Sequence, residues 1–335
     1  MHHDILIWIL VFLQGLVGSM GFGGREGVVF SPVSSHQWSM KLVNETVSDE
    51  DLARIHELGI SVISGEWGMD DIGPAEVLGL LDRVQAHQLK IVINFSDGSA
   101  WGYAEDGSDT PDQKPVWQTE KVQLYLKQIK HHPAIYGYDI SNEAGENLPN
   151  GQDIRITSAQ LRGAAQDVRA IDPGRPISMR MHYWDAADTD FDWKNPFVSG
   201  VVDIVMLNLY SNYTQDGYSP ALPTMIADTG QHLIDKIHAV DPYVRIWVAL
   251  AAFREEPQFV TPSPADLQRD IKAALALKGV DNIGFFGWGP ERFPTQGQGW
   301  YLPRDGAALL TTIHSFASDE EGAIFHQKPL KTLWE

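Results

Sequence analysis

The chain has 335 residues, of which 43% are hydrophobic, so it can bury one large core. Its formal net charge of −19 argues against nucleic acid and anionic membrane surfaces as partners, because phosphate binding needs clustered Lys and Arg. The absence of cysteine excludes disulfides, thiolate nucleophiles and Cys-based zinc sites. Eleven Trp and ten Tyr offer flat aromatic faces, which suit sugar rings as well as a core.

The first predicted element is an apolar segment at residues 5–17. It is shorter than the ~20 residues that a spanning helix needs, and Val17 and Ser19 fit a signal peptidase site. Because no Lys or Arg precedes it, an N-terminal helix or membrane anchor stays open as the alternative. We expect residues 1–26 to be a signal peptide or N-terminal hydrophobic segment. The mature chain would be secreted or periplasmic, with no stable membrane partner after cleavage.

Short apolar runs then alternate with amphipathic stretches, the pattern of successive strands and helices. In the first half, we predict strands at residues 28–30, 61–64, 90–95 and 135–140, and helices at 48–58, 74–87 and around 122–129. The first strand leads into residues 34–38, which we place at its carboxyl end. Ser48, followed three residues later by Asp51, marks the start of the first helix.

In the second half, we predict strands at residues 177–181, 201–208, 245–253 and 283–288, and helices at 158–171, 222–240, 264–277 and 307–316. Eight strands in alternation with helical stretches predict an α/β fold with a single (β/α)8 TIM barrel over residues 27–318. A doubly wound open sheet is the competitor. It would show a Gly-rich phosphate turn after its first strand, and residues 34–37 are not one. Residues 319–335 form a polar C-terminal tail.

The most informative segment is residues 135–143, where an apolar run ends in Asn142 and Glu143. Continuous hydrophobic residues closed by a polar loop are typical of a buried parallel strand. The carboxyl end of such a strand is where α/β folds place their chemistry. There, an amide beside a carboxylate can serve a substrate hydroxyl and a proton transfer. The alternative is a loop Glu next to an Asn that caps the following turn.

In a barrel, the carboxyl ends of all strands converge on one mouth. The predicted ends carry carboxylates, amides, His and aromatic residues, a set that suits glycosidic bond cleavage. No metal-ligand spacing is present, so we expect no metal and no cofactor. A Schiff-base enzyme would need a Lys at a strand end. We place none there, because Lys90 precedes its strand and Lys41 lies beyond the first predicted one.

Residues 137–143 resemble the strand-four signature of the clan A glycoside hydrolases, the (β/α)8 retaining enzymes that include endoglucanases and mannanases. In that signature, the Glu, here Glu143, is the general acid/base, and the Asn, here Asn142, binds the sugar 2-hydroxyl. The resemblance covers almost the whole predicted barrel. It implies a glycoside hydrolase that cleaves β-linked poly- or oligosaccharides, with a carbohydrate substrate as its partner.

Other strand ends match the clan in the same order along the chain. His182 with Tyr183 is similar to the strand-five cluster, and Tyr210 matches the strand-six Tyr that lies near the nucleophile. Trp288 corresponds to the platform Trp under the cleaved sugar. Further substrate contacts are expected from the remaining polar and aromatic residues of the mouth, namely Trp38, Trp67, Glu66 and Asp97.

Strand seven departs from the clan pattern. In the clan, the nucleophile is a Glu at the end of this strand, where the present sequence has Leu250 or Ala251. The nearest carboxylates are Glu255 and Glu256. If the strand runs longer through a bulge, one of them becomes the nucleophile, Tyr210 orients it, and the enzyme is retaining.

Two alternatives to a retaining enzyme stay open. An inverting enzyme would draw its base from Asp97, Glu66, Asp185 or Glu291, across ~6.5–9.5 Å rather than the ~5–5.5 Å of retaining enzymes. A barrel that has lost its nucleophile would bind carbohydrate without cleaving it. A second carboxylate within reach of Glu143 is what separates these readings.

Overall fold

The computed structural model describes residues 36–42, 47–65, 67–103, 115–143, 156–182, 196–212, 224–254, 259–260, 262–289, 302 and 306–317. All of them belong to the compact unit Ser35–Glu335. The predicted N-terminal segment and C-terminal tail lie outside the described residues. Within the described part, none of the helices is both long and apolar enough to cross a membrane.

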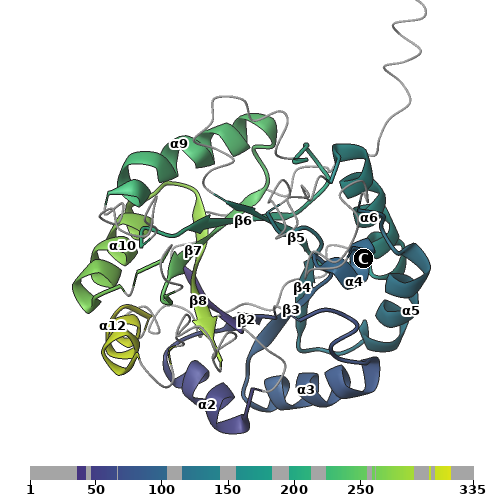
Figure 1. The fold of residues 1–335 in the computed structure, drawn as a ribbon, viewed down its shortest axis with the longest axis horizontal. Helices are drawn as coiled ribbons and strands as arrows, with labels where there is room; N and C mark the ends of the chain where they lie inside the picture. The colour runs from purple at the N-terminus through teal and green to yellow at the C-terminus, as the bar shows by residue number, and fades with distance from the viewer. Residues whose placement is uncertain are drawn as a thin grey trace, which may run out of the picture. The chain divides into compact units, whose positions relative to one another are not determined.

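Eight parallel strands follow one another in sequence order around a closed barrel, and β1 pairs with β8 (Figure 1). The strands are β1 (Gln37–Leu42), β2 (Val62–Ser64), β3 (Lys90–Asn94), β4 (Ile135–Asp139), β5 (Ile177–His182), β6 (Ile204–Leu209), β7 (Arg245–Ala251) and β8 (Val280–Trp288). The predicted (β/α)8 barrel is thereby confirmed.

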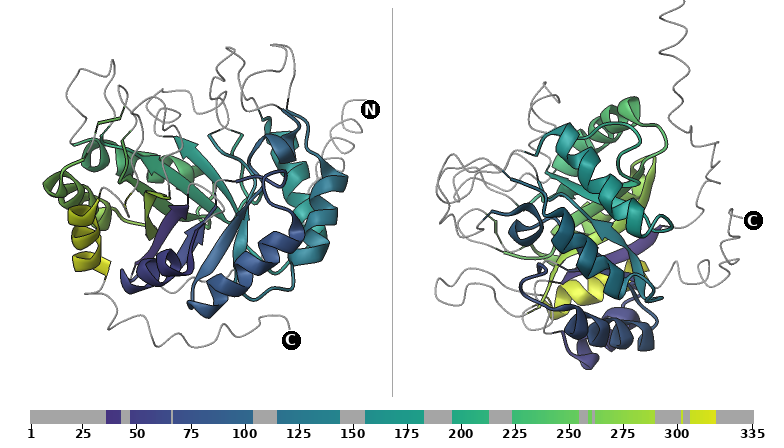
Figure 2. Two further views of the ribbon diagram at one scale, coloured as in Figure 1. Left: turned by 60° about the horizontal axis from the view of Figure 1, so that its bottom comes forward. Right: turned by 90° about the vertical axis from the view of Figure 1, so that its right-hand side faces the viewer.

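Helices surround the ring of strands, as Figures 1 and 2 show. They are α2 (Asp49–Glu57), α3 (Pro74–Ala86), α4 (Gly98–Trp101), α5 (Thr119–Ile129), α6 (Ser158–Ile171), α9 (Met225–Val240), α10 (Pro264–Ala276) and α12 (Ala307–Ala317). The capping box predicted for α2 is present: Asp51 N–H donates to Ser48 Oγ, and Ser48 N–H donates to Asp51 Oδ2. Such reciprocal bonds satisfy two amide donors at a helix start, which is why this signature locates it well.

Side chains alternate between two sides of the barrel wall. The apolar residues of β1, Trp38, Met40 and Leu42, join the large cluster that the strands form with the helices. The opposite side of the wall carries Ser39 and Lys41. This inner side is apolar at one level, where a small cluster contains Val62, Val92, Ile204, Met206 and Trp247. Elsewhere it carries polar and charged groups, among them Ser39, which donates to Asn282, and Asp139, which pairs with Arg180.

The first strand differs from the prediction. It spans Gln37–Leu42, whereas residues 28–30, predicted as the strand, lie outside the described part of the chain. Trp38 is therefore near the amino end of β1, away from the mouth, and Lys41 lies near its carboxyl end. The prediction failed because the inner face of this strand is polar, so its sequence alternates instead of forming the continuous apolar run that was sought.

Candidate active site

The segment after β4 stays paired with β5 as far as Glu143. Ile140 N–H donates to Ser178 C=O at 2.9 Å, Arg180 N–H donates to Ser141 C=O at 2.7 Å, and Glu143 N–H donates to Arg180 C=O at 3.2 Å. Glu143 has a φ of 41°, in the left-handed region. For a residue other than glycine this conformation is strained, and residues held in such conformations cluster at functional sites.

The carboxylate of Glu143 is held from β6. Asn208 Nδ2 donates a hydrogen bond to Glu143 Oε1. Asn208 is buried and pairs with His182 in the β5–β6 register, so strand order alone brings these three side chains together. The bond makes the two carboxylate oxygens of Glu143 inequivalent, because Oε1 accepts a hydrogen bond from the amide of Asn208. Sequence reasoning placed Asn208 at the end of strand six but did not foresee this contact.

His182 lies at the end of β5 and is largely buried. Burial lowers its pKa below the ordinary 6.5, while the negative charge of nearby Glu143 opposes this shift. The imidazole is therefore neutral at neutral pH and offers one donor and one acceptor. Its ring lies edge-on to that of Tyr210, with the centroids 6.3 Å apart. The structure thus brings together the predicted residues Glu143, His182 and Tyr210.

Asn142, the neighbour of Glu143, carries an unused acceptor. Its Oδ1 atom is buried and accepts no hydrogen bond within the described residues. A buried polar atom without a partner costs about 1–3 kcal/mol, so native structures rarely keep one without a use. A hydroxyl donor from a bound molecule is a chemical match for this oxygen.

The end of β7 is apolar. Ala251 and Phe253 pack with Tyr210 in a cluster that also includes Phe259 and Phe286. In its described part, strand seven therefore directs no carboxylate toward the mouth. Glu255 and Glu256, the predicted nucleophile candidates, lie outside the described residues.

The tryptophans predicted to stack on sugars are buried. Trp288 is 1% exposed, and its Nε1–H donates to Asp51 Oδ1 of α2 at 3.1 Å, so its ring points to the helices. Trp38, also 1% exposed, stacks on Phe285. This placement does not serve the stacking role predicted for either. Strict alternation would put Phe286 and Trp288 on one side, but the β1–β8 register shifts beside them, so Phe286 lies on the inner side and Trp288 in the outer cluster.

Other predicted residues are occupied or undescribed. Asp97 caps α4, since its Oδ1 accepts hydrogen bonds from Ser99 Oγ at 2.7 Å and Ala100 N–H at 3.2 Å. Trp67 is buried in the core cluster. Glu66, Tyr183, Asp185 and Glu291 lie outside the described residues. No group of three or more His, Asp or Glu side chains within the described part is arranged to hold a metal ion.

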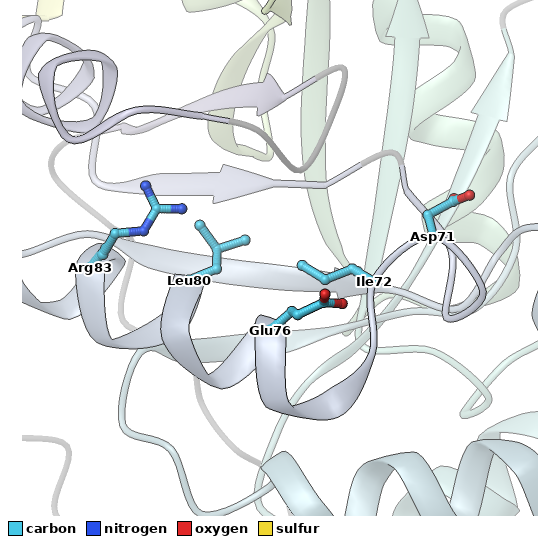
Figure 3. A pocket seen from close by; sticks show the side chains of 5 residues that line it. All are labelled: Asp71, Ile72, Glu76, Leu80 and Arg83. Carbon is cyan, nitrogen blue, oxygen red and sulfur yellow. The ribbon is translucent and has the colours of Figure 1, made fainter.

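A pocket of about 280 Å³ lies against α3 (Figure 3). Asp71, Ile72, Glu76, Leu80 and Arg83 line it. None of these belongs to the predicted site, and Arg83 is already engaged, because it donates to Val47 C=O and lies 3.6 Å from Asp49. Among the described residues, the predicted site residues that lie together are at the ends of β4, β5 and β6.

Comparison with known proteins finds no family model that matches the sequence and no curated protein that matches it. Solved structures do resemble the fold. One is a GH5_18 protein of Streptomyces cattleya in complex with GlcNAc, with a TM-score of 0.60 at 15% identity over 85% of this chain and 80% of that one. A variant of GH5_18 from Bifidobacterium longum, in complex with Manβ1-4GlcNAc, has a TM-score of 0.59 at 13% identity over 86% and 79%.

A third resemblance is to a β-galactosidase from the psychrophilic Marinomonas ef1, with a TM-score of 0.58 at 12% identity. The match covers 84% of this chain and 59% of the β-galactosidase, so this chain corresponds to little more than half of that protein. At such low identity the similarities establish the barrel. What happens in its mouth has to be argued from the residues there.

Proposed function

We propose that this chain is a glycoside hydrolase that cleaves β-glycosidic bonds in a poly- or oligosaccharide, with Glu143 as its general acid. The observation that carries the proposal is Glu143 itself, held in a left-handed conformation at the end of β4 with one oxygen bonded to Asn208. Proteins that share the fold are crystallised with Manβ1-4GlcNAc and GlcNAc, which supports a sugar as the ligand.

The proposed chemistry divides the two oxygens of Glu143 between two tasks. Oε1 accepts the bond from Asn208, so in the protonated form of Glu143, which acts as the acid, the proton to be donated is on Oε2. When that proton moves to the leaving glycosidic oxygen, the charge that forms on the carboxylate strengthens the Asn208 bond. Asn142 Oδ1 accepts a hydrogen bond from a sugar hydroxyl, which we assign to the 2-hydroxyl. His182, neutral and adjacent, provides a second polar contact.

The second carboxylate is proposed to come from the segment after β7. Side chains alternate along a strand, and Phe253 faces the mouth cluster. If that alternation continues, Glu255 is the next side chain on the inner side. A retaining mechanism would use Glu255 or Glu256 as nucleophile and Tyr210 to orient it. Substituting each Glu separately by Ala tests them, and the anomer released, followed by NMR, tests whether configuration is retained.

The runner-up function is a carbohydrate-binding barrel without catalysis. One observation favours it: the end of β7 presents Ala251 and Phe253, where a retaining enzyme of this fold would carry its nucleophile. Such a protein would bind sugars through the same residues and release no product.

The deciding experiment is reducing-end release from β-glucans, mannans, xylans and galactans, with Glu143→Gln beside wild type. General acid catalysis contributes about 10²–10⁴-fold, so we expect Glu143→Gln to lose activity by that factor while still binding the substrate. Glu120→Gln, on the outer helix α5, is the matched control. Turnover of Glu143→Gln within tenfold of wild type would contradict the assignment. Binding without release by wild type would favour the binding barrel.

A further inference from the structure

A buried ion pair lies inside the barrel below Glu143. Asp139, the last residue of β4, is 0% exposed, and Arg180 of β5 is 3% exposed. Arg180 Nε lies 2.7 Å from Asp139 Oδ2. Taking two charges out of water is costly, and an apolar pair of similar size often stabilises a fold as well or better. The pair therefore calls for an explanation other than stability.

Arg180 contacts every second residue of the chain between Asp139 and Glu143. Its side chain pairs with Asp139, its N–H donates to Ser141 C=O at 2.7 Å, and its C=O accepts the N–H of Glu143 at 3.2 Å. Its Nη2 also donates to Gly65 C=O, just beyond β2, at 3.4 Å. One residue thus connects the ends of three strands, and Glu143 is the last group in the series.

We propose that the Asp139–Arg180 ion pair is a positioning device that holds Glu143 in its left-handed conformation, and so aims the carboxylate at Asn208 and the mouth. The side chain of Arg180 fixes its own backbone, and that backbone carries the carbonyl to which Glu143 is bonded. The catalytic consequence rests on the proposed function, but the positional claim does not. Neither Asp139 nor Arg180 needs to touch a substrate for the device to work.

His182 offers a way to test the geometry without any substrate. The charge of Glu143 raises the pKa of His182 against the lowering caused by burial, so this pKa reports how near Glu143 lies. NMR titration of labelled His, with His182 assigned from its missing signal in His182→Asn, gives the value. Glu143→Gln removes the charge, so the fall of the His182 pKa in this variant is the largest fall that displacing Glu143 can cause.

The informative variant replaces both charges at once, Asp139→Leu with Arg180→Met, because this leaves neither partner of the pair buried alone. We expect the pKa of His182 to fall toward its value in Glu143→Gln. We also expect kcat to fall by ~100-fold with KM little changed, since a displacement of about 1 Å can cost that much. Ser39→Ala is the control, because it removes another hydrogen bond inside the barrel, the one to Asn282, and should change neither quantity.

A folded double variant with an unchanged His182 pKa would overturn the proposal. If that variant does not fold, Asp139→Asn keeps the shape and weakens the pair. A smaller fall in the His182 pKa is then expected, and no fall would equally overturn the proposal. If no substrate is found for wild type, the titration still decides the positional claim. A fall in the His182 pKa without any measurable turnover would support positioning while contradicting the proposed hydrolase.

Discussion

Two regions of the barrel mouth contrast with each other. At the ends of β4, β5 and β6, polar side chains are fixed by one another: Asn208 bonds Glu143, and His182 lies within its electrostatic reach. At the ends of β7 and β8, aromatic rings gather, with Tyr210 joining Phe253, Phe259 and Phe286. Proton transfer needs the first kind of surface, and a sugar ring face suits the second. The difference fits the proposed acid on one side and an apolar wall for the sugar on the other.

Among the predictions that test this contrast, the largest effect is expected from breaking the polar region at Asn208. Asn208→Leu removes the donor to Glu143 Oε1 and leaves that oxygen facing a methyl group. If the bond strengthens as Glu143 gives up its proton, kcat should fall by about 10–100-fold, on the scale of a charge-assisted hydrogen bond of roughly 1.5–3 kcal/mol. KM should change much less.

Steady-state kinetics with Asn208→Leu and Asn208→Gln would measure this effect. The longer amide of Gln keeps the donor and should restore part of kcat. Equal losses in kcat for the two variants would mean that the amide fills space rather than supporting Glu143.

A pair of aromatic substitutions tests which ring of the apolar region contacts the substrate. Phe286 is partly exposed and faces the mouth cluster, whereas Trp288 is buried against α2. We expect Phe286→Leu to raise KM by up to about tenfold, because an aromatic contact contributes about 0.5–1.5 kcal/mol beyond its buried area. Trp288→Phe should leave KM unchanged and lower the free energy of unfolding by about 1 kcal/mol through loss of the bond to Asp51.

Kinetics and urea unfolding of both variants give the answer. The reverse result, with KM raised by Trp288→Phe and unaffected by Phe286→Leu, would restore the platform role that the sequence predicted for Trp288.

How much could be predicted from the sequence differs between these regions for physical reasons. Buried parallel strands are visible in the sequence as continuous apolar runs, so most of the barrel and the position of Glu143 could be predicted. β1 was misread because its inner face is polar. The side on which Trp288 lies depends on an irregularity in the β1–β8 register, which alternation counted along the sequence does not reveal. The bond between Asn208 and Glu143 depends on strand order and register around the closed barrel, which no local pattern encodes.

The smallest expected effect concerns stability against pH and involves the polar region alone. The pKa of His182 is lower in the folded protein than the ordinary 6.5, so below about pH 6.5 the unfolded chain binds a proton that the folded one resists. The contribution of His182 to stability is therefore complete above that pH and decreases as pH falls toward the folded pKa.

Urea unfolding at pH 7 and pH 5 should show a smaller loss of stability for His182→Asn than for wild type over that interval. His314, on the outer helix α12, is the matched position for a His→Asn control. Because Glu143 opposes the shift, Glu143→Gln should enlarge the loss in a protein that retains His182. An equal loss of stability between pH 7 and pH 5 in Glu143→Gln and wild type would contradict this. Glu143 and His182 would then not interact electrostatically, and the polar region would not be the connected group described above.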